Sequence, residues 1–175
     1  MRRIAFLCLT LLTLSGILTG CAAAGQEEDT PLTPQERTEL YKTAVEDACA
    51  QDGNTFVEIV TSQEDEMAEF LFTALELEAE DMTAYALAIS PVNIQAYGIA
   101  AVYPAAGKED DVLEALNGFI DTQKESFHQY LEQEYETASN TRLETLEDGT
   151  ILMVMHPDQD TVFDAIRDTV EGAQT

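Results

Sequence analysis

Two pairs of apolar segments, each followed by a helical pattern, most constrain how this chain can fold. Residues 83–90 and 94–103 are rich in alanine, isoleucine and tyrosine, which is typical of strands. Residues 141–147 and 150–156 flank Asp148-Gly149, a dipeptide that favours a tight hairpin turn. The sequence therefore predicts about four strands arranged as two neighbouring pairs.

Helical periodicity follows each predicted strand pair. Apolar side chains recur at helical spacing over residues 109–135, with acidic residues in the first turn, and again after Pro157-Asp158. Two further helices precede the strands, one after Thr33 and one over residues 64–75. The order strand, strand, helix, strand, strand, helix predicts an α+β domain with a mostly antiparallel sheet, preceded by N-terminal helices.

The first helix has the clearest start signal. Thr33 is placed to cap it, with Pro34 at its first position and Glu36 completing a capping box. Cys49 falls on the apolar stripe of this helix, so we expect it to be a buried and inert thiol. Gly53 is expected to end the element, and residues 55–60 form a short apolar run that the pattern leaves unassigned.

The first strand pair allows a specific register to be predicted. If Ser90 lies opposite Ile94, alternation of side chains places small residues on one face and large ones on the other. The predicted small-face pairs are Ala88 with Ala96, Ala86 with Gly98 and Ala84 with Ala100; the large-face pairs are Leu87 with Tyr97 and Tyr85 with Ile99. We expect the 109–135 helix to pack closely on the small face.

The large face then needs a cover of its own. The N-terminal helices could supply that cover and bury the face. If they do not, Tyr85, Tyr97 and Tyr103 would form an exposed amphipathic patch suited to a protein partner. Both outcomes are compatible with the sequence.

The N-terminus carries an export pattern. Arg2 and Arg3 precede an uncharged apolar run over residues 4–17, which is shorter than the roughly 20 residues of a membrane span. The ending Leu18-Thr19-Gly20-Cys21 resembles the lipobox of bacterial lipoproteins. The resemblance implies cleavage before Cys21 and a diacylglyceryl group on its sulfur; an ordinary signal peptide with an incidental Cys21 is the alternative.

This pattern divides the chain into three parts. Residues 1–20 are expected to be a signal peptide, residues 21–32 a flexible acidic tether, and residues 33–171 a single α+β domain. The mature protein would be held at the extracytoplasmic face of the cell membrane through lipidated Cys21. Cys8 leaves with the signal peptide and Cys21 is expected to be acylated, so Cys49 is expected to have no intramolecular partner for a disulfide.

The charge of the mature chain excludes one class of partner. The full chain has a net charge of −26, and removal of residues 1–20 takes away Arg2 and Arg3 but no acidic residue, which gives −28. Such a surface repels nucleic-acid phosphates and anionic lipid headgroups. We therefore expect no nucleic-acid binding, and a domain that stands off the bilayer holding its anchor.

Recognisable catalytic patterns are missing from the sequence. His128 and His156 are its two histidines, and neither lies in a metalloprotease or other catalytic motif. No nucleotide-binding glycine loop, paired-cysteine metal site or cofactor motif is present. The sequence favours a non-enzymatic binding or accessory domain without a cofactor, and a small hydrolase that uses carboxylates is the alternative.

Several features over about residues 70–170 also resemble a known family. They include the apolar segment at residues 85–90, Gln123 and Tyr130 in the long helix, the turn at Gly149, and residues 151–155 leading into Pro157-Asp158. The pattern resembles the uncharacterised lipoprotein family named domain of unknown function 4358. Because that family has no assigned activity or site, the resemblance implies an architecture and implies no functional residue.

Overall fold

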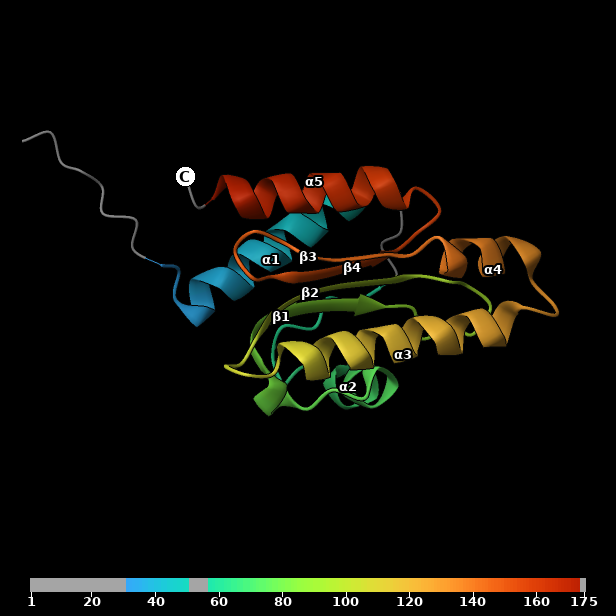
Figure 1. Ribbon diagram of the computed structural model, residues 1–175, viewed down its shortest axis with the longest axis horizontal. Helices are drawn as coiled ribbons and strands as arrows, with labels where there is room; N and C mark the ends of the chain where they lie inside the picture. Colours follow the sequence, from blue (N-terminus) through green and yellow to red (C-terminus); the bar gives the residue numbers. More distant parts are fainter. Residues whose placement is uncertain (1–30, 51–56, 174–175) are drawn as a thin grey trace, which may run out of the picture.

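A computed structural model of the chain describes residues 31–50 and 57–173, in which helices flank one antiparallel sheet (Figure 1). The α+β prediction is confirmed, and so is the order of strands and helices. The elements are α1 (Pro34–Cys49), α2 (Ala68–Leu75), a 3-10 turn η1 (Ala79–Asp81), β1 (Met82–Ile89), β2 (Gly98–Pro104), α3 (Glu109–Phe127), α4 (Glu132–Ser139), β3 (Arg142–Thr145), β4 (Ile151–Met155) and α5 (Gln159–Gly172).

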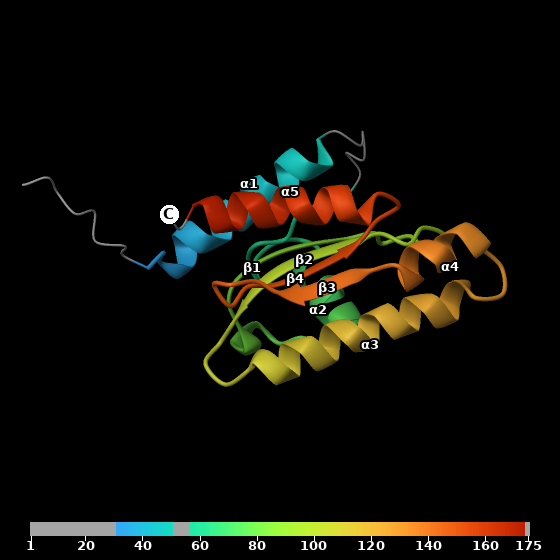
Figure 2. The ribbon, with the colours of Figure 1, turned by 45° about the horizontal axis from the view of Figure 1, so that its top comes forward.

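The sheet lies between two layers of helices. Its strand order is β1-β2-β4-β3, and each neighbouring pair is antiparallel. Helices α1 and α5 cover one face, and α2 and α3 cover the other (Figures 1 and 2). Both faces of β1 and β4 are therefore largely buried, which explains why these two strands read as continuous apolar runs in the sequence.

The predicted register of β1 and β2 is wrong by three residues. Ala86 pairs with Ala101 instead of Gly98, and Leu87 pairs with Ala100 instead of Tyr97. The connection over residues 90–97 is longer than expected, because the N–H of Ser90 bonds to the carbonyl of Tyr97 and β2 begins only at Gly98. An odd shift exchanges the faces of one strand relative to the other.

This register combines small and large side chains on each face. Ala88 pairs with Ile99, Leu87 with Ala100, and Ile89 with Gly98. The expected separation into a small face and a large face is therefore wrong, since large side chains such as Leu87, Ile89 and Ile99 lie opposite small ones.

The helix expected on the alanine side of β1 lies on the opposite face. Val112, Leu116 and Phe119 of α3 pack in the core that contains Tyr85 and Leu87. The alanines of β1 instead face α1 and α5, in the core that contains Tyr41 and Phe163. Small side chains on β1 do admit a closely packed helix, but that helix is α1.

The expected 109–135 helix is divided into α3 and α4. A straight helix of that length would extend about 40 Å, whereas a strand as long as β1 spans about 26 Å. The chain turns after Phe127, so Leu131 and Tyr135 pack back against the core and Tyr130 is left 83% exposed. Gln123 is half-buried, so the predicted stripe holds as far as Phe127.

The predicted hairpin turn at Asp148-Gly149 is confirmed. Gly149 has φ +89°, a backbone conformation that favours glycine. The Asp148 carboxylate accepts hydrogen bonds from the N–H of Thr150 at 2.9 Å and from its hydroxyl at 2.8 Å. The strands on either side are shorter than predicted, because β3 ends at Thr145 and β4 begins at Ile151.

A buried ion pair joins α1 to this turn. The Arg37 guanidinium is paired with Asp148 and lies 4.0 Å from the centre of the Tyr103 ring. It also donates to the Tyr41 hydroxyl at 3.3 Å, and that hydroxyl lies 2.5 Å from the hydroxyl of Thr150. Burial raises the pKa of Tyr41 to about 12. The capping box predicted at Thr33 is confirmed, and it begins α1, the helix that carries Arg37 and Tyr41.

Several smaller expectations are tested by the described residues. Cys49 is half-buried instead of buried, and its Sγ lies 3.0 Å from the Tyr97 hydroxyl. Val60 of the unassigned segment forms an antiparallel bridge with Leu87 at the outer edge of β1. Helix α2 begins at Ala68, four residues later than expected.

The signal peptide, Cys21 and Gly53 lie outside the described residues. Of the helices described, none is long and apolar enough to cross a membrane.

Candidate binding groove

The tyrosines considered as a partner surface do not share one. Tyr85 is 8% exposed and packs on the α3 side of the sheet, whereas Tyr97 is 3% exposed and packs on the α1 side. Tyr103 is half-buried beneath the Arg37 guanidinium. Helices cover both faces of the sheet, so these tyrosines do not form the exposed patch that an uncovered face would have given. Cys21, the predicted lipidation site, lies outside the described residues.

The two histidines lie apart from each other and have different surroundings. His128 is exposed, and its ring contacts Tyr135 edge to face. His156 is buried, and its Nδ1 accepts a hydrogen bond from the N–H of Asp158 at 2.9 Å. Within residues 31–50 and 57–173, no three histidine, cysteine or acidic side chains come together as a metal site would require.

A groove of about 530 Å³ lies between α2 and the segment that leads into η1. This volume is within the range of 300–1,000 Å³ that is typical of ligand sites. Apolar and polar side chains both contribute to its walls. The lining residues are Gln63, Ala68, Glu69, Phe72, Thr73, Glu76, Leu77 and Glu78.

The groove is shaped by how α2 ends. Glu76 has φ +55°, a left-handed conformation that glycine usually supplies at this position. The N–H of Leu77 then bonds back to the carbonyl of Phe72 at 3.0 Å. This reversal buries Leu77 in the core while Glu76 and Glu78 remain exposed beside the helix. The local backbone thus places carboxylates around an apolar floor.

Phe72 is the aromatic residue of the floor. It is half-buried, and its ring meets the ring of Tyr85 edge to face with centroids 5.7 Å apart. Ala68 and Leu77 are buried on either side of it in the lining. Because Tyr85 belongs to β1, this ring contact joins the floor of the groove to the sheet.

The sequence contains part of this site but does not identify it. Residues 76–81 are recognisable as an acidic connector, a pattern more typical of a solvated surface. Helical spacing places Phe70 on one apolar stripe with Leu71 and Leu75, yet Phe70 is 45% exposed. Phe72 is outside that stripe and points to the groove instead. The signal that could have found the floor is a second aromatic residue on a short helix whose apolar stripe was already complete.

The segment that forms the groove belongs to a known protein family. The family model described as Domain of unknown function (DUF4358) matches residues 58–156, more than half of the chain. The chain belongs to this family. No curated protein and no solved structure matches it.

The DUF4358 match includes the groove. It begins before α2, contains all four strands of the described sheet, and ends directly after β4. Helices α1 and α5, which cover the other face, lie outside the match. The groove is therefore formed entirely by the matched DUF4358 segment, whereas the Arg37–Asp148 pair joins that segment to a flanking helix.

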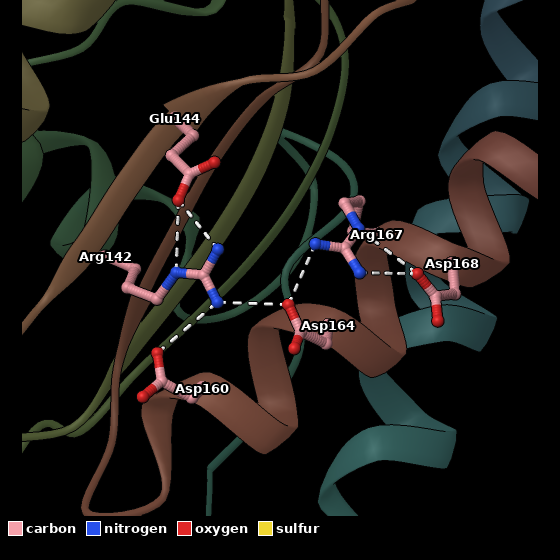
Figure 3. A network of polar contacts seen from close by, with 6 residues as sticks. All are labelled: Arg142, Glu144, Asp160, Asp164, Arg167 and Asp168. Atoms are coloured by element: carbon pink, nitrogen blue, oxygen red, sulfur yellow. Dashed lines mark hydrogen bonds and ion pairs between the residues drawn. The ribbon is translucent and has the colours of Figure 1, made fainter.

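Every basic side chain in the residues that the structure describes forms an ion pair with a carboxylate of the same chain. One network joins β3 to α5: Arg142 pairs with three acidic residues, and Arg167 shares one of them (Figure 3). The network consists of Arg142, Glu144, Asp160, Asp164, Arg167 and Asp168. The remaining basic residues in the described ranges are also in ion pairs, namely Arg37, Lys42, Lys108 and Lys124.

The glutamates of the groove differ from these paired acids. Glu69, Glu76 and Glu78 are exposed, and within the described ranges none of them is in an ion pair. Asp81, just beyond the groove, is different. Hydrogen bonding from the N–H of Glu78 and the ion pair with Lys108 lower the pKa of Asp81. The groove therefore keeps negative charge that the chain itself leaves uncompensated.

Proposed function

We propose that this DUF4358 protein is a lipoprotein anchored through Cys21 at the extracytoplasmic face of the membrane, and that its folded domain is a non-enzymatic module that binds a partner in the α2 groove. The anchor is supported by the export pattern of residues 1–21. Two acyl chains would hold the protein stably, since each buried methylene contributes about 0.8 kcal/mol and a single chain binds only marginally.

The observation that carries the binding role is the groove itself. It combines a fixed apolar floor around Phe72 with polar side chains at its rim, the composition typical of recognition sites. The candidate tyrosine surface is buried, so the groove is the feature of the described residues that best fits a partner.

The alternative, a hydrolase that uses carboxylates, receives less support from this geometry. Acid–base catalysis by two carboxyl groups requires environments that distinguish them, such as an apolar pocket around the acid. Glu69, Glu76 and Glu78 are all exposed at the groove rim. We therefore favour binding over catalysis.

The anchor is tested by mass spectrometry of the N-terminal peptide from the membrane fraction. We expect a peptide that begins at Cys21 and carries the acyl mass, and we expect Cys21→Ser to release the protein from membranes. An unmodified Cys21, or cleavage at another position, would contradict the proposed anchor.

The binding role is tested by two threonine variants that are locally matched. Thr73 in α2 and Thr169 in α5 are both exposed, and each hydroxyl donates to the carbonyl four residues earlier, at 2.8 and 2.9 Å. Thr73→Arg fills the groove with a long side chain, whereas Thr169→Arg makes the same change on a distant surface. Partners recovered from cross-linked membranes with the wild type should be lost with Thr73→Arg and kept with Thr169→Arg. Equal recovery with both variants would reject the groove.

A further inference from the structure

We infer that the groove receives a peptide segment of a partner protein that presents a lysine or arginine beside an aliphatic or aromatic side chain. This inference rests on the proposed function and names the chemistry of the partner. The argument combines the charge of the rim with the apolar floor, because neither property alone defines the ligand.

The sign of the ligand charge follows from the distribution of ion pairs. The basic side chains of the described residues are already held by carboxylates, so an anionic ligand would find no unengaged cation there. At the groove, Glu69, Glu76 and Glu78 supply three carboxylates that are in no ion pair within the described ranges. Complementary charge then favours a cationic ligand and speeds its encounter with the acidic protein.

The apolar floor of the groove indicates that the ligand carries an apolar group in addition to its positive charge. Half-buried Phe72 offers apolar surface that a small inorganic cation or a linear polyamine would leave uncovered, while Ala68 and Leu77 are buried beside it in the lining. The three glutamates also do not come together as a metal site in the part of the chain that the structure describes. An aliphatic or aromatic side chain would cover Phe72 and gain the hydrophobic stabilisation of that contact.

A peptide supplies both groups on one backbone. Neighbouring side chains of an extended segment point in opposite directions, and alternate ones point the same way, so one segment can place an apolar residue on the floor and basic residues toward the rim. The Gln63 amide and the Thr73 hydroxyl, both in the lining, can bond to peptide groups. Anchoring at a membrane surface would present this groove to proteins in the same compartment.

The test measures the binding of defined peptides by fluorescence anisotropy. The full processed lipoprotein is placed in phosphatidylcholine nanodiscs, and empty nanodiscs serve as the blank. The probe is a labelled decapeptide that alternates lysine with phenylalanine and leucine. One comparison peptide has glutamate for every lysine, and another has serine for every apolar residue. We expect binding of the first peptide only, with affinity that falls as salt is raised.

A matched pair of charge variants tests the rim. The triple variant Glu69→Gln, Glu76→Gln and Glu78→Gln should weaken binding of the lysine peptide at least about fivefold, the combined effect of three exposed ion pairs. The control triple variant removes the same charge from exposed glutamates of α3 and α4, at Glu125, Glu132 and Glu136. It should change the affinity less than about twofold at physiological salt, because distant charges are screened.

The outcomes separate this inference from the function on which it rests. Three results would overturn the inference. In the first, the lysine peptide would fail to bind; in the second, the glutamate or serine peptide would bind as tightly as the lysine peptide; in the third, the two triple variants would have equal effects. The proposed function would still stand if Thr73→Arg, but not Thr169→Arg, abolished capture of the cellular partner. If those two arginine variants captured the partner equally, the groove itself would be excluded.

Discussion

Replacing Arg37 with methionine should strongly destabilise the domain, because it leaves a buried carboxylate without its counter-charge. The side chains of Arg37 and Asp148 are 8% and 6% exposed. Removal of one partner from a buried ion pair typically costs about 3–5 kcal/mol. Asp148 would keep its two hydrogen bonds from Thr150, so we expect a loss near the lower end, about 3 kcal/mol.

The assay is urea unfolding of the chain from residue 22 onward, followed by far-ultraviolet circular dichroism. Arg167→Met is the matched control, because Arg167 forms ion pairs with Asp164 and Asp168 on the surface. That control should lose at most about 1 kcal/mol. The denaturant slope should stay constant, so that a shift in midpoint reports a change in stability.

A double variant distinguishes the ion pair from a simple loss of packing. Arg37→Met combined with Asp148→Asn removes both charges from the buried cluster and keeps similar volume. Its loss of stability should be smaller than the sum of the two single losses by at least about 1 kcal/mol. Strict additivity, or a cost for Arg37→Met equal to that for Arg167→Met, would refute the view that this pair fastens α1 to the hairpin turn.

Three further changes test other parts of the fold. Ala86→Phe should overpack the interface between β1 and α1 and cost about 1–3 kcal/mol in urea unfolding; unchanged stability would contradict close packing there. Gly149→Ala should cost about 1 kcal/mol, because φ is +89° while the added Cβ would meet Tyr103 only at 3.6 Å; no loss would show that the turn relaxes. Burial of Tyr41 should lower stability by about 2–3 kcal/mol as the pH rises from about 10, the pKa of an unfolded tyrosine, toward the folded value of about 12; the fall should be smaller by that amount in Tyr41→Phe, which keeps only the contribution of other groups such as buried Tyr85.

The sequence predicted the start of a helix or a turn well where specific side chains mark that position. The capping box at Thr33 and the Asp148-Gly149 turn are set by nearby side chains and backbone, and both are confirmed. The register of β1 and β2 was not predictable in the same way, because it depends on a loop whose ending at Gly98 has no distinct turn signal. The division of α3 from α4 depends on the length of the strands beneath the helix, which no local pattern predicts.

The groove could be predicted even less from the sequence. It depends on Glu76 adopting a conformation usual for glycine, and on the ring of Phe72 packing against Tyr85 of the following strand. The first is a backbone conformation that glutamate rarely adopts, and the second is a tertiary contact, so local preference predicts neither. The buried position of Tyr85 and Tyr97 likewise follows from helices on both faces, which the sequence left open.

The most direct test of the binding proposal is photo-cross-linking in cells that express the anchored protein. A benzophenone amino acid replaces Thr73 in the groove in one strain and Thr169 on α5 in another. Illumination should give a discrete adduct of the protein at position 73 and none at position 169, and the adduct should be lost when the three groove glutamates are changed to glutamine. The same adducts from both positions, or none from position 73, would contradict the account.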